Sequence, residues 1–241
     1  MKLRVWVLAI AAWHALAAGP QPVPVVAELF TSEGCSSCPP ADRLLAELDR
    51  TQPVAGARVI VLSEHVDYWN QLGWRDPFSL PQFSRRQEQY ARVLGGDVYT
   101  PELVVDGRDP VLGNDAAAVG KAILRAAARA KAPVRIAGAR REGAEAAIGI
   151  SIPPLAKGRG EVWVAIADES ARSSVSRGEN AGRTLVHVAV VRSLTKAGKV
   201  DKSEGMERTL RMAVGQAPAR AIVFLADSGG TIFGADEAAV R

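Results

Sequence analysis

The residues whose types and spacing could do chemistry are Cys35 and Cys38, the only two cysteines of the chain, arranged as C-x-x-C. They follow an apolar β-type run, Val23–Phe30, and precede an amphipathic helix that the apolar spacing predicts over Ala41–Arg50. A thiol at the first turn of a helix faces unpaired backbone N–H groups, which favour the thiolate and lower its pKa. The pattern therefore predicts a reactive pair, with Cys35 nearer the helix start and more exposed.

The first residues of the chain predict export. A basic region at Lys2 and Arg4 precedes a short apolar run, and Ala15-Leu16-Ala17 has the small residues that a signal peptidase recognises. We therefore expect a cleaved signal peptide at residues 1–18 and a periplasmic or secreted protein without stable membrane insertion. Cleavage would lower the formal charge of +4 by two, and so small a surplus predicts no nucleic-acid partner.

Export affects how the two cysteines are interpreted. In an oxidising compartment, two cysteines usually form one structural disulfide. A bridge between Cys35 and Cys38 would close a very small loop, however, and would constrain little of the unfolded chain. Reactivity therefore explains the pair better than stabilisation does.

The elements after the cysteines indicate how the pair is positioned. A continuous apolar run, Arg58–Ser63, predicts a buried strand that completes a parallel βαβ unit. Helical spacing follows over Pro81–Leu94, and Asp106-Gly107 between two apolar runs predicts a hairpin. Asn114 or Asp115 can cap a further, alanine-rich helix that extends through Ala130.

This order of elements, with C-x-x-C after the first strand and Thr100-Pro101 before the third, resembles the thioredoxin fold. The resemblance covers about residues 23–131. It implies that Cys35 attacks as a nucleophile and that Cys38 resolves the mixed disulfide. It also implies that Pro101 follows a cis peptide bond beside the disulfide, with Thr100 presenting backbone groups to an extended substrate.

A narrower resemblance rests on the residues from Glu28 to Asp42, on His65–Trp69 and on Tyr99–Pro101. These stretches are similar to a family of exported bacterial thioredoxin-like proteins of unknown function. The similarity continues through Arg177–Asn180 and Val190–Arg192. It implies the fold and export, and says little about the substrate.

From Pro133 onward the pattern changes to short β-type runs separated by Gly, Pro and charged turns. The runs are Val134–Ala139, Ala146–Ile152, Glu161–Ala167, Leu185–Arg192, Thr209–Ala213 and Ala221–Ala226. We therefore expect an α/β thioredoxin-like domain over residues 20–132, followed by a smaller, mostly antiparallel and sandwich-like β domain over 133–241. The polar loop Arg177–Gly182 is longer than a turn requires and is a candidate to dock on the first domain, whereas His187 is expected to be structural.

Three further residues are candidates for a proton relay. Glu28 lies within an apolar run, so it is either a buried carboxylate beside the dithiol or an edge charge facing solvent. His65 and Asp67 follow the second strand, at the edge where open α/β sheets hold their sites. They could assist proton transfer, but a hydrogen-bonded structural network under Tyr68 and Trp69 is the favoured interpretation.

The leading functional hypothesis is an exported thiol–disulfide oxidoreductase whose partners are protein thiols or disulfides. The alternative is a protein that binds Cu(I) or zinc through Cys35, Cys38 and His65. A third hypothesis makes the C-terminal part a partner-binding module on a thioredoxin scaffold. The sequence contains no P-loop, dinucleotide fingerprint or histidine cluster, so no cofactor is expected.

Overall fold

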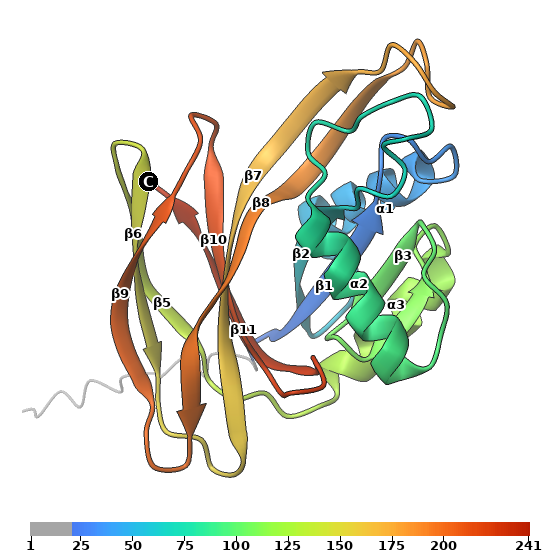
Figure 1. The fold of residues 1–241 in the computed structure, drawn as a ribbon. Helices are drawn as coiled ribbons and strands as arrows, with labels where there is room; N and C mark the ends of the chain where they lie inside the picture. The colour runs from blue at the N-terminus through green and yellow to red at the C-terminus, as the bar shows by residue number, and fades with distance from the viewer. Residues whose placement is uncertain (1–20) are drawn as a thin grey trace, which may run out of the picture.

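The fold begins with two parallel strands, β1 (Val23–Thr31) and β2 (Ala57–His65), joined by helix α1 (Pro39–Thr51). Figure 1 shows this βαβ unit in the computed structural model, which describes residues 21–241. The predicted signal peptide, residues 1–18, lies outside the described residues. Within residues 21–241, no helix has the length and apolar character needed to cross a membrane.

The helices begin and end where the local chemistry favours it. Helix α2 (Pro81–Leu94) has the predicted bounds: proline occupies its first turn and Gly95, at φ +74°, ends it in the left-handed conformation. Helix α3 (Ala116–Ala127) is shorter than predicted, because it ends three residues before Ala130. Its N-cap is Asp115, whose Oδ1 accepts a hydrogen bond from the backbone N–H of Ala118 at 2.9 Å.

Replacing Asp115 with alanine should lower the free energy of unfolding by about 1 kcal/mol, because the cap bond to Ala118 is lost. Chemical denaturation of both proteins measures the difference. Asn114→Ala is the control, because the neighbouring amide does not provide the cap. Equal losses in the two variants would contradict the assignment of the cap to Asp115.

Eight strands form one sheet in the order β11-β10-β7-β8-β2-β1-β3-β4. The strands not yet bounded are β3 (Glu102–Val105), β4 (Asp109–Leu112), β7 (Arg159–Ser174), β8 (Thr184–Asp201), β10 (Ala219–Ala226) and β11 (Ile232–Val240). The N-terminal and C-terminal strands meet where Ser63 of β2 pairs with Val190 of β8. Both halves of the chain therefore contribute to a single mixed sheet.

A separate antiparallel sheet contains β5 (Arg135–Glu142), β6 (Glu145–Ile152) and β9 (Met206–Ala213). Apolar residues of β6, among them Ile148 and Ile150, form a buried core with Val164 of β7 and Val223 of β10. The helices instead pack on the other core, around β1 and β2. A thioredoxin-like α/β part followed by a sandwich-like β part is therefore confirmed as the fold class.

Strand β11 has no counterpart among the predicted strands. Two acidic residues, Asp236 and Glu237, interrupt its apolar pattern. In the fold these carboxylates lie near cations of the same sheet, since Asp236 Oδ1 is 2.9 Å from Arg58 Nη2 and Glu237 Oε2 is 3.5 Å from Arg220 Nη1. Partners distant in sequence thus allow acidic residues in a strand that periodicity alone does not detect.

The longest hairpin of the molecule, β7–β8, reaches from the β-rich half to the start of α1. Figure 1 shows its arm extending past α1 and the loop after β2. Its tip, residues 175–183, contains the polar loop Arg177–Gly182 that the sequence offered as a docking segment. This arm brings C-terminal residues to the cysteines.

Candidate functional site

Cys35 and Cys38 form a disulfide at the start of α1, with their Cα atoms 5.4 Å apart. A turn brings them together: the N–H of Cys38 donates to the Cys35 carbonyl at 3.2 Å. Cys38 directly precedes the first helical residue, so it, and not Cys35, is nearer the helix. Both side chains are fully buried, whereas Ser36 and Ser37 between them are exposed. The expectation of a more exposed Cys35 is therefore wrong.

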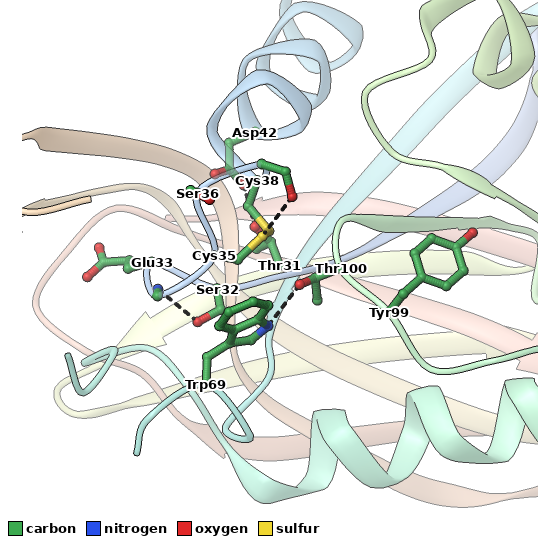
Figure 2. Close-up of a disulfide and its surroundings, with 12 residues drawn as sticks. Thr31, Ser32, Glu33, Cys35, Ser36, Cys38, Asp42, Trp69, Tyr99 and Thr100 are labelled. Carbon is green, nitrogen blue, oxygen red and sulfur yellow. Dashed lines mark hydrogen bonds between the residues drawn. A yellow bond between two sulfur atoms is a disulfide. The ribbon is translucent and has the colours of Figure 1, made fainter. Parts of the chain in front are cut away.

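The Thr100–Pro101 peptide bond is cis, as the resemblance to thioredoxin implies. Trp69 connects this segment to the cysteine loop. Its indole Nε1–H donates to Thr100 Oγ1 at 2.9 Å, and its Cβ is only 3.0 Å from where a side chain at Gly34 would begin. Figure 2 shows Trp69 and Thr100 beside the disulfide. The structure thus brings together Cys35, Cys38 and the Thr100–Pro101 segment.

The β7–β8 tip covers this loop. The Asn180 side chain is fully buried, and its Nδ2 donates to the carbonyl oxygens of Glu33 at 2.8 Å and Cys35 at 3.0 Å. Next to it, Glu179 Oε2 accepts a hydrogen bond from the N–H of Ser36 at 3.0 Å. The predicted docking of this loop on the first domain is confirmed.

A buried histidine lies between two carboxylates that flank the cysteines in sequence. His187 Nε2 is 3.2 Å from Glu33 Oε1, and His187 Nδ1 is 3.6 Å from Asp42 Oδ2. Asp42 Oδ1 in turn accepts a hydrogen bond from Thr31 Oγ1 at 2.9 Å. Glu33 precedes Cys35 by two residues and Asp42 follows Cys38 by four, so His187 bridges both ends of the C-x-x-C segment.

The surroundings of His187 determine its ionisation. Burial favours the neutral imidazole, but Asp42 and Glu33 outweigh burial and raise the pKa of His187 to about 10. At 3.6 Å, the Asp42 oxygen is beyond good hydrogen-bond geometry, so its effect is mainly that of its charge. His187 is therefore a buried cation at neutral pH, held between two carboxylates.

His65 is fully buried and belongs to the adjoining network. Its Nδ1 lies 2.6 Å from Asp76 Oδ2, and its ring meets that of His187 edge-on at 4.6 Å. Asp76 Oδ2 also accepts the N–H of Glu33 at 2.8 Å. Burial opposes ionisation of Asp76, but the charge and hydrogen bond of His65 and the N–H groups of Glu33 and Phe78 outweigh it, so the pKa of Asp76 is lowered.

The other two relay candidates contact different partners. Asp67 Oδ1 accepts a hydrogen bond from Ser84 Oγ, at 2.5 Å, near the start of α2. Glu28 is buried on the α2 face of the sheet, where Arg86 Nε at 2.6 Å and the Tyr90 hydroxyl at 2.7 Å donate to its carboxylate. The structure therefore places Glu28 and Asp67 against α2 and does not bring them to the disulfide.

A family model described as "Protein of unknown function (DUF1223)" matches residues 26–226. The chain belongs to the DUF1223 family. The crystal structure of protein AGR_C_4864 from Agrobacterium tumefaciens is similar, with 30% identity and a TM-score of 0.68 over 90% of this chain and 94% of that one. HBP35 of Porphyromonas gingivalis has 15% identity and a TM-score of 0.64 over 92% of this chain and 77% of that one, which shows a shared fold. None of the curated proteins matches the chain.

The narrower resemblance, to a thioredoxin-like family of unknown function, agrees with this membership. In this DUF1223 protein, the fold is thioredoxin-like and carries a C-x-x-C disulfide. Within residues 21–241, no three His, Cys, Asp or Glu side chains are grouped so that they could hold a metal ion. The copper hypothesis, built on Cys35, Cys38 and His65, thus gains no support from the described part of this DUF1223 chain.

Sequence reasoning missed a second buried polar cluster in this DUF1223 protein. Glu64 follows the apolar residues of β2 and is fully buried, 3.8 Å from Arg86 Nε. Burial and the charge of Glu28 raise the pKa of Glu64 well above its usual range. The available signal was a carboxylate at the end of an apolar run, since Glu64 still belongs to β2 and the predicted strand ends at Ser63.

Proposed function

We infer that this protein catalyses thiol–disulfide exchange outside the cytoplasm, with Cys35 as the nucleophile, Cys38 as the resolving thiol and protein thiols or disulfides as substrates. The observation that carries the inference is the C-x-x-C disulfide at the start of α1, linked by Trp69 to the cis Thr100–Pro101 segment. A bridge that closes so short a loop adds little stability, so its placement supports reactivity.

Exchange would proceed in two displacements. In the reduced protein, the Cys35 thiolate attacks one sulfur of a substrate disulfide, and the other substrate sulfur leaves as a thiolate. The Cys38 thiolate then attacks the Cys35 sulfur, forms the internal disulfide and releases the second substrate thiolate. Two electrons pass from the protein to the substrate, and the reverse sequence oxidises a substrate dithiol.

Asp42 is the side chain that we assign to proton exchange with Cys38. Residues four apart lie on the same helix face, and Asp42 follows Cys38 by four at the start of α1. Figure 2 draws both side chains at the start of α1. Asp42 is buried and accepts a hydrogen bond from Thr31, which supports giving it the relay role for which the sequence offered Glu28.

Burial of both cysteines sets a requirement for exchange. A substrate thiolate must approach a sulfur in line with the bond that breaks. Because Ser36 and Ser37 are exposed while Cys35 and Cys38 are not, the sulfurs lie just below the surface. Exchange therefore requires a movement that exposes a sulfur to the substrate.

The decisive test is the reduction potential of the Cys35–Cys38 pair. Mature protein is equilibrated in graded dithiothreitol or glutathione buffers, and free thiols are trapped by alkylation and counted by mass. We expect a value within the span of exchange proteins, about −270 to −120 mV. A sample equilibrated in denaturant controls for slow access to the buried pair. A native value below about −300 mV would identify a structural bridge and refute exchange.

A further inference from the structure

Both the NH₂ group and the oxygen of the Asn180 side chain have hydrogen-bond partners, and two of the three partners belong to the cysteine loop. Both Nδ2 hydrogens are donated, to the carbonyl oxygens of Glu33 and Cys35, and Oδ1 accepts from Arg183 Nη1 at 2.9 Å. The orientation of the amide follows from its partners, because only an NH₂ group can donate to two carbonyls. Asn180 is separated from Cys35 by 145 residues, so the contact depends on the tertiary fold.

The Cys35 carbonyl has two donors. One is Asn180 Nδ2, and the other is the N–H of Cys38, the bond that closes the turn between the cysteines. The hairpin tip also holds the next residue, because Glu179 accepts the N–H of Ser36. The tip therefore fixes the backbone on both sides of the Cys35 side chain.

We propose that Asn180, supplied by the β7–β8 hairpin, is a positioning residue of the redox centre that holds the Cys35–Cys38 turn in the geometry of the closed disulfide. The inference rests on the proposed exchange function and extends it, because it assigns part of the site to the C-terminal half of the chain.

The physical effect concerns the reduced state. When the disulfide is reduced, the covalent tie between the sulfurs is gone and the turn depends on its hydrogen bonds. A turn that Asn180 anchors keeps the Cys38 thiol close to Cys35, and this proximity acts as a high effective concentration. It favours attack of Cys38 on the Cys35 sulfur of a mixed disulfide, with release of the substrate thiolate, and favours the closed disulfide at equilibrium.

Asn180→Ala should therefore make the Cys35–Cys38 disulfide easier to reduce. We expect the equilibrium constant for closing it against dithiothreitol to fall about tenfold, which equals a rise of about 30 mV in its reduction potential. The mixed disulfide with a model substrate should also persist longer. Asn180→Ser, which keeps one hydroxyl donor, should show a smaller change of the same sign. Thermal unfolding of the oxidised proteins establishes that each variant is folded.

Arg177→Ala is the matched control, because Arg177 is exposed in the same tip. It should leave both the potential and the mixed-disulfide lifetime unchanged. The positioning role would be overturned if folded Asn180→Ala and Asn180→Ser both had the wild-type reduction potential and the wild-type mixed-disulfide lifetime. The proposed exchange function would then be unaffected. If the wild-type potential instead fell in the range of structural disulfides, exchange would be refuted, and the variant-to-wild-type difference in the same buffers would still decide the role of Asn180.

Discussion

Replacing Cys38 with serine should convert the protein into a trap for its substrates. The proposed mechanism gives Cys35 the first displacement and Cys38 the second, so the Cys38→Ser variant should attack a substrate disulfide and then stop. The Cys35→Ser variant should lose exchange down to the uncatalysed rate, because it has no attacking thiolate. Non-reducing gels of the two variants, with mass spectrometry of the adducts, measure both outcomes.

Ser36→Ala is the matched control for these cysteine variants. Ser36 lies between the cysteines and is exposed, and the substitution leaves both thiols and its backbone N–H in place. It should retain exchange near the wild-type rate and form no stable adducts. Adducts of equal abundance in Cys35→Ser and Cys38→Ser would contradict the assignment of Cys35 as nucleophile.

Raising the pH from about 6.5 to about 10 should destabilise the oxidised protein, and His187 should be a main cause. The folded environment raises the pKa of His187 from its ordinary value of 6.5 to about 10. The folded state therefore binds more protons than the unfolded state across this window, so its stability falls as the pH rises. The contribution is fully present below pH 6.5 and amounts to at most about 5 kcal/mol.

The test compares denaturant unfolding of the wild type with that of His187→Gln at several pH values. At pH 7, we expect the variant to be less stable by about 3–5 kcal/mol, because Glu33 and Asp42 lose the cation between them. The difference should shrink as the pH approaches 10. Glu64, whose pKa is also raised, is present in both proteins and cancels in the comparison.

Arg192→Gln provides the control for this pH dependence. Arg192 lies on the same strand, near Asp168, and an arginine stays protonated throughout the window. Its removal should therefore leave the pH slope as in the wild type. A difference between His187→Gln and wild type that stayed constant from pH 6.5 to 10 would contradict the buried imidazolium.

The sequence predicted best what short-range patterns control. Apolar runs and turn residues located the βαβ unit, and the bounds of α2 were predicted correctly from Pro81 and Gly95. The cis bond before Pro101 followed from the resemblance to thioredoxin. Each of these features depends on a stretch of a few residues, so a linear pattern was enough to find it.

The surroundings of the disulfide could not be predicted in the same way. Asn180 and His187 meet the cysteine loop only because the β7–β8 hairpin crosses to the other half of the sheet. Asn180 lies in a stretch that the family resemblance includes, but the resemblance assigns this residue no role. His187 belongs to no such stretch, and a single histidine in a strand usually has a structural role. The sequence also could not determine on which face of the sheet the Glu28 side chain lies. The strand β1 is buried on both faces, so its apolar run does not alternate with polar residues.

The large separation between the cysteines and their cover implies an order of assembly. Cys35 and Cys38 are three residues apart, whereas the hydrogen bonds from the hairpin tip to this loop join residues 143 to 147 apart. Contacts of such different range form at different times, because closing a long chain segment costs more entropy than closing a turn. The pair is therefore open to oxidants in the unfolded chain and becomes enclosed when the β7–β8 hairpin docks, so that its redox state can be set while the chain folds.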